Sequence, residues 1–182
     1  MIPPIYRKLA DELIVELHLL SHQKNFKITP VFSLGLRELF SVFTNGYKPN
    51  EHKKLLFNAI CNCNGFKPEE IESKSDELVI KIKSCTHRDL YENIDSIDDN
   101  RSNDSYYSRI NSIGIYKIVK ELTDSDKLEI NELDSEIKKL AEQIGYPKDR
   151  VEKDIITYRT NIDKMNQALE IIVQNIISKK KD

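Results

Sequence analysis

Hydrophobic side chains recur every three or four residues along most of this chain, with polar side chains between them. That spacing puts the apolar residues on one face of an α-helix, whereas a half-buried strand would show strict alternation. Prolines stand near the starts of several such segments, and glycines stand at the ends of others. The pattern predicts helices over residues 5–24, 30–45, 50–63, 67–83, 106–122, 132–144 and 148–181.

We therefore expect an all-α fold, a compact bundle of about six to seven helices with a long C-terminal helix patterned like a coiled coil. Residues 92–104 are rich in acidic residues, Ser and Asn and have few apolar anchors, which predicts an exposed loop. We expect residues 1–145 to form a helical domain. Residues 146–182 are expected to form a long helix that packs on this domain or projects from it.

The C-terminal helix has the most regular pattern in the chain. Its apolar positions are separated by alternating gaps of four and three residues, which is the heptad repeat of a coiled coil. This heptad seam consists of Val151, Ile155, Tyr158, Ile162, Met165, Leu169, Ile172 and Ile176. At ~1.5 Å per residue the helix spans roughly 50 Å, more than the width of a small domain. The seam suits packing on the chain's own helices near Val151 and contact with a partner further along, through Ile162, Met165, Leu169, Ile172 and Ile176.

The first predicted helix carries more apolar residues than one face can hold. One face consists of Ile5, Leu9, Leu13, Leu17 and Leu20. Val15 and Leu19 fall outside it, which predicts that this helix is covered on more than one side.

Composition narrows the class of protein. The 182 residues include 39% hydrophobic and 32% charged residues, with a formal net charge of -2. The absence of a basic excess argues against a dedicated nucleic-acid binder. The most apolar stretch, Leu13 to Leu20, is interrupted by Glu16 and His18, so we expect a soluble or peripheral protein without a transmembrane segment.

Two groups of residues could bind a metal ion. His18 and His22 lie one helical turn apart, but position 19 is Leu where a zinc hydrolase of this spacing has Glu. Cys61, Cys63 and Cys85, with His87 as a fourth ligand, form the second group, although one residue between paired ligands is too few for a favourable zinc site. We favour structural roles for both groups and expect no cofactor, and we keep a small metal- or pigment-binding protein as the alternative.

Catalytic motifs find little support. The five glycines are isolated and form no phosphate-binding loop, and no Ser lies in a nucleophile elbow. Glu12 and Glu16 lie four residues apart, but solvation or pairing with cations such as Arg7 and Lys8 explains them better than a shared catalytic site. We therefore expect a protein that is not an enzyme.

Several segments together resemble the thylakoid formation protein family, also called the photosystem II biogenesis protein family. They occur in the family's order over nearly the whole chain, with residues 67–104 contributing little. The segments are Ile5-Tyr6-Arg7 with residues 11–21, residues 32–36 and 43–47, residues 56–61, Tyr107-Ser108-Arg109 with Ile113-Gly114-Ile115, Gly145-Tyr146-Pro147 with residues 150–154, Tyr158-Arg159 and Lys164-Met165.

This resemblance implies a helical, non-enzymatic protein of cyanobacteria and plastids. Such a protein would act in thylakoid formation and in photosystem II assembly or repair, on the cytoplasmic or stromal side of the thylakoid membrane. The implied partner is the membrane-bound, ATP-dependent zinc metalloprotease complex of the FtsH class, which would carry the catalysis. Family members usually have further residues before Ile5-Tyr6-Arg7, and the resemblance assigns no contact residues.

Overall fold

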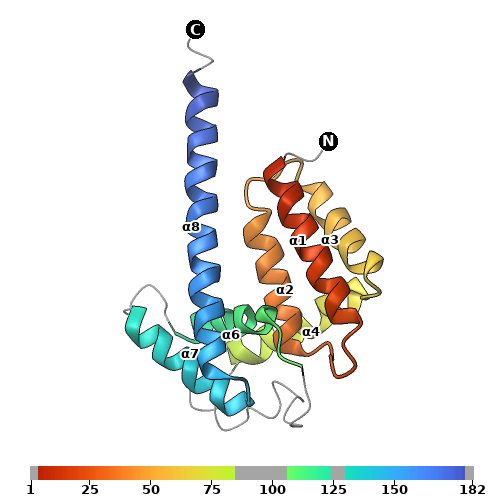
Figure 1. Cartoon of the computed structure of the whole chain (residues 1–182), viewed down its shortest axis with the longest axis vertical. Coiled ribbons are helices and arrows are strands. Elements are labelled where there is room, and N and C mark those ends of the chain that lie inside the picture. Colours follow the sequence, from red (N-terminus) through yellow and green to blue (C-terminus); the bar gives the residue numbers. More distant parts are fainter. Residues whose placement is uncertain (1–3, 85–105, 124–129, 179–182) are drawn as a thin grey trace.

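The computed structural model describes residues 4–84, 106–123 and 130–178 of the chain. Within these residues there are helices and no strands, which confirms the predicted all-α class (Figure 1). The helices are α1 (Pro4–Ser21), α2 (Pro30–Phe43), α3 (Glu51–Cys63), α4 (Pro68–Ser84), α6 (Arg109–Leu122), α7 (Ile130–Ile144) and α8 (Lys148–Ser178). The loop predicted over residues 92–104 lies outside the described residues.

Side-chain caps set the ends of these helices. Thr29 caps α2 by accepting a 3.1 Å hydrogen bond from the amide of Phe32, as its position before Pro30 predicts. Helix α6 begins at Arg109 rather than at the predicted residue 106, because Ser108 and Asn111 form a reciprocal capping box. Helix α1 ends at Ser21, three residues before the prediction.

The early end of α1 has a visible cause. The Ser21 hydroxyl donates to the carbonyl oxygen of His18 at 2.8 Å, and Nδ1 of His22 lies 2.8 Å from the same oxygen. These side chains occupy an acceptor that a continued helix would offer to its own backbone amide.

Helices α2 and α6 cross in contact at two glycines. A Cβ atom on Gly35 would lie 2.0 Å from the carbonyl oxygen of Ile110 and 2.8 Å from the amide nitrogen of Gly114. A Cβ atom on Gly114 would lie 2.1 Å from the carbonyl oxygen of Val31. Backbone atoms cannot rotate away as a side chain can, so this crossing requires glycine on both helices.

Two apolar clusters share this pair of helices. In the first cluster, α2 and α6 pack with α4, α7 and the beginning of α8, where Val151 and Ile155 are buried. In the second cluster, α2 and α6 pack with α1, α3 and the beginning of α4, and Tyr158 of α8 joins them. Because α2 and α6 belong to both clusters, their crossing holds the two halves of the core together.

Helix α8 is partly built into this core. Its 31 residues rise past the ends of α1, α2 and α3, so its last turns stand clear of the other helices (Figure 1). The early heptad positions Val151, Ile155 and Tyr158 are buried against the domain's own helices, as expected near Val151. The coiled-coil pairing of the later positions and the division of the chain at residue 145 stay predictions.

The prediction that α1 is covered on more than one side is wrong for its described residues. Leu13, Leu17 and Leu20 are buried, but Val15 is 58% exposed and Leu19 is 60% exposed. Helix α1 lies at the edge of the bundle beside α2 and α3, so only one face meets the second cluster (Figure 1).

The sign of the change in unfolding free energy caused by Gly35→Ala tests the helix crossing. Helix propensity alone predicts that alanine stabilises the protein by about 1 kcal/mol. The close approach predicts the opposite, a loss of about 1–3 kcal/mol or more, because the two helices must separate. Urea unfolding monitored by circular dichroism measures the difference. Ser41→Ala, on the exposed side of α2, is the control and is expected within about 0.5 kcal/mol of the parent. A more stable Gly35→Ala variant would contradict the crossing.

Candidate functional site

Three consecutive residues at the start of α6 connect the first and last helices. The Tyr107 hydroxyl donates a 2.7 Å hydrogen bond to Oδ2 of Asp154 on α8. Ser108 caps α6, and Arg109 donates through Nε and Nη2 to Oε2 of Glu16 on α1, each at 2.5 Å. The Tyr-Ser-Arg segment therefore fixes α1, α6 and α8 at one point.

Glu16 is the more buried partner of its ion pair with Arg109. Its side chain is 15% exposed, whereas that of Arg109 is 55% exposed. Burial raises the pKa of the Glu16 carboxyl above its ordinary value of 4.5; the adjacent Arg109 acts in the opposite direction, and the charge of Asp154 adds to the rise. The partner of Glu16 is thus a distant arginine rather than the neighbouring Arg7 or Lys8 that the sequence suggested.

Tyr107 is held on several sides. Its ring centroid lies 5.4 Å from that of Tyr146, and the guanidinium of Arg150 lies 5.4 Å above the Tyr107 ring. Asn111 donates a 2.8 Å hydrogen bond to the hydroxyl of Tyr146. Burial raises the pKa of Tyr107, and its hydrogen bond to Asp154 raises it further, so the phenol stays protonated and donates.

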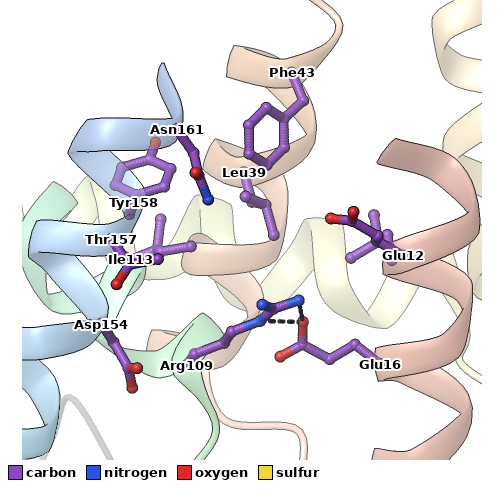
Figure 2. Close-up of a pocket in the computed structure, with 11 residues that line it drawn as sticks. Glu12, Glu16, Leu39, Phe43, Arg109, Ile113, Asp154, Thr157, Tyr158 and Asn161 are labelled. Atoms are coloured by element: carbon purple, nitrogen blue, oxygen red, sulfur yellow. Dashed lines mark hydrogen bonds and ion pairs between the residues drawn. The ribbon is translucent and has the colours of Figure 1, made fainter. Parts of the chain in front are cut away.

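A pocket of about 120 Å³ lies between α1, α2, α6 and α8 beside this cluster (Figure 2). Its apolar wall includes Leu39 and Phe43 of α2, Ile113 of α6 and Tyr158 of α8. Figure 2 shows the Arg109–Glu16 pair below these side chains. The polar remainder of the lining consists of Glu12, Glu16, Arg109, Asp154, Thr157 and Asn161.

A wider groove of about 760 Å³ shares lining residues with the pocket and lies between α1, residues 106–109 and the beginning of α8. Four charged residues line both, namely Glu12, Glu16, Arg109 and Asp154. The groove adds the exposed side chains of Val15 and Leu19, together with Tyr106. We call the two cavities together the α1 groove, with the smaller one as its inner pocket. Glu12 and Glu16, which the sequence analysis considered as a shared site and set aside, both line it. The rest was missed because Arg109 with Glu16 and Tyr107 with Asp154 are far apart in the chain.

The residues of the metal- or pigment-binding alternative are placed as follows. The rings of His18 and His22 lie side by side with centroids 4.5 Å apart, and both residues are exposed. Cys61 is buried in the second cluster, where burial raises the pKa of its thiol to about 12, and Cys63 is exposed. Cys85 and His87 lie outside the described residues. Among the described residues, no three His, Cys, Asp or Glu side chains group as metal ligands.

The candidate partner residues on α8 divide into two groups. Ile162 is half-buried and packs against the second cluster, and Met165 is 7% exposed. Leu169, Ile172 and Ile176 lie further along α8. Their side chains lie outside what the structure describes, and their contact with a partner stays a prediction.

The helical architecture places this chain in a class of all-α proteins represented by the solved structure of Psb29 at 1.55 Å. The two structures match with a TM-score of 0.84 and 27% sequence identity, over 98% of this chain and 88% of the Psb29 chain. The family model for thylakoid formation protein matches residues 1–182, so the chain belongs to the thylakoid formation protein family.

Curated relatives agree with this assignment. Protein Thf1 of Prochlorococcus marinus (strain NATL1A) is 54% identical over 179 residues, covering 98% of this chain and 90% of that protein. Protein Thf1 of Synechococcus sp. (strain CC9902) is 35% identical over 187 residues, covering 100% of this chain and 84% of that protein. The resemblance stated from the sequence is therefore confirmed.

Membership gives the chain a role in thylakoid formation and photosystem II biogenesis. The family is named for a thylakoid formation factor rather than for an enzyme. In the described parts of the chain, no helix has both the length and the apolar character needed to cross a bilayer.

The Arg109–Glu16 pair generates a prediction about pH. Because the folded-state pKa of Glu16 is raised, protonated Glu16 contributes stability that is fully present below its ordinary value of 4.5 and lost as the pH rises through the folded-state pKa. The unfolding free energy of the parent minus that of Glu16→Gln should therefore fall as the pH rises over this window. Urea unfolding at a series of pH values measures it.

The variant Arg109→Gln provides the comparison. It removes the cation that lowers the pKa of Glu16. The stability that protonated Glu16 contributes, measured as Arg109→Gln minus Arg109→Gln with Glu16→Gln, should therefore fall by more as the pH rises. At neutral pH Arg109→Gln should also destabilise the protein by about 1–3 kcal/mol, because a partly buried carboxylate loses its charged donor. The assignment would be contradicted if the unfolding free energy of the parent minus that of Glu16→Gln rose with pH.

Proposed function

We propose that this protein is a non-enzymatic interaction factor that binds and sustains the membrane-bound FtsH-class protease complex during photosystem II assembly and repair. It acts from the cytoplasmic or stromal side of the thylakoid membrane, in solution or peripherally attached. ATP hydrolysis and proteolysis belong to the partner, and this chain contributes helical binding surface.

The proposal rests on the distal part of α8. The helix ends at Ser178, about 46 Å from its start at ~1.5 Å per residue, and its last turns rise past the domain that holds its first half (Figure 1). The heptad seam continues in the sequence through Leu169, Ile172 and Ile176. Ile171, next to the seam, is 58% exposed. A heptad seam on a projecting helix suits pairing with a helix of another protein.

Affinity capture from detergent-solubilised thylakoid membranes tests the proposal. The tagged chain should retain FtsH-class protease subunits. The triple variant Leu169→Asp, Ile172→Asp and Ile176→Asp should lose most of this capture, because three carboxylates in a helix–helix contact would be desolvated without partners.

The matched control puts the same charges on the opposite side of α8. Positions 160, 167 and 174 repeat at heptad intervals away from the seam, so the control is Thr160→Glu, Gln167→Glu and Gln174→Glu. It should retain the protease subunits at the parent level, and both triple variants should keep the parent's circular dichroism spectrum. Equal capture by parent and seam variant would contradict the proposal, as would failure of the parent to retain any protease subunit.

A further inference from the structure

The α1 groove presents apolar surface to solvent on a helix whose other face is already buried. Val15 and Leu19 lie one turn apart on α1, are 58% and 60% exposed, and both line the groove. Tyr106, which is 39% exposed, lines it as well. Binding of another molecule that removes such side chains from water lowers the free energy.

The charges of the groove favour a cationic occupant. Its acidic residues are Asp11, Glu12, Glu16 and Asp154, and its basic residues are Arg109 and Arg150. Arg109 is paired with Glu16, and the exposed Arg150 lies over the ring of Tyr107, so four acidic residues face two basic ones and the lining carries an excess of negative charge. Asp11 and Glu12 stand exposed on α1 at the rim. Nucleic acids and anionic lipid surfaces are disfavoured here, whereas Lys and Arg side chains are favoured. A second copy using the same face would bring acidic rim against acidic rim.

The inner pocket has the size of an anchor site. Its volume of about 120 Å³ is close to that of the roughly 150 Å³ apolar cavities that hold a benzene-sized group. Leu39, Phe43 and Ile113 line it, and the Arg109–Glu16 pair lines both the pocket and the wider groove. One large apolar side chain inserted into such a pocket is the usual centre of a protein–peptide contact.

We propose that the α1 groove binds a basic amphipathic helix of a partner protein, with one aromatic or large aliphatic side chain in the inner pocket. Val15 and Leu19 cover the apolar face of the bound helix, and the excess negative charge of the lining, with Asp11 exposed at its rim, attracts its Lys or Arg residues. This surface is separate from the distal seam of α8, so the chain has two docking surfaces.

A model peptide tests this site with the full-length protein. The probe is a fluorescein-labelled amphipathic helix of about 18 residues, long enough to be helical, built from Leu and Lys with one central Phe. Fluorescence anisotropy should show binding that weakens with added salt. A Leu–Glu peptide of the same pattern should not bind, and replacing the Phe by Ala should weaken binding by about tenfold.

Variants locate the peptide on the surface. Val15→Gln with Leu19→Gln should weaken binding by about tenfold, and Asp11→Asn with Glu12→Gln should weaken it and reduce its salt dependence. The matched controls are Leu55→Gln with Ile80→Gln, which are equally exposed elsewhere, and Asp163→Asn with Glu170→Gln on α8. Both controls should bind within about twofold of the parent.

Three outcomes would overturn the inference. They are equal binding of the Leu–Glu peptide, equal loss of affinity in the groove and control variants, and a dimer in light scattering that Val15→Gln with Leu19→Gln converts to monomer. The last would mean that a second copy occupies the groove. The Asp variants of the α8 seam should still bind the peptide, so failure of this proposal is separable from failure of the protease proposal.

Discussion

The rest of this structure depends on the contact between α2 and α6, where the two backbones approach so closely that a Cβ atom fits on neither Gly35 nor Gly114. Because these helices belong to both apolar clusters, the crossing sets the position of α4, α7 and α8 on one side and of α1 and α3 on the other. Glycine in a helix interior destabilises the helix by about 1 kcal/mol relative to alanine at each position, and the packing at this contact offsets that loss.

The crossing also positions the surfaces proposed to act in binding. Arg109 begins α6, one turn before Ile113 and Gly114, so the depth of the crossing determines where its guanidinium meets Glu16 of α1. Tyr107 extends the same connection to Asp154 of α8. The α1 groove and the projecting part of α8 are therefore held by one rigid centre.

Short sequence patterns predicted where helices begin and which faces are apolar. Contacts between residues far apart in the chain became visible only in the folded structure. Thr29 before Pro30 marks a helix start whatever surrounds it, and the heptad seam identifies the inner face of α8 near Val151. Gly35 and Gly114 are isolated in the sequence, and only their meeting across two helices explains them. Likewise, Glu16 and Arg109 are 93 residues apart, so the sequence suggested nearer cations. Val15 and Leu19 were apolar enough to predict burial, but no element of the described chain covers them.

Native-state hydrogen exchange, followed by NMR, tests most directly whether the α2–α6 crossing is the centre of the fold. We predict that amides near Gly35 and Gly114 exchange only through global unfolding, with an opening free energy equal to that from urea unfolding under the same conditions. This prediction would be contradicted if these amides opened at a lower free energy while those of α3 or α7 remained protected to the global limit.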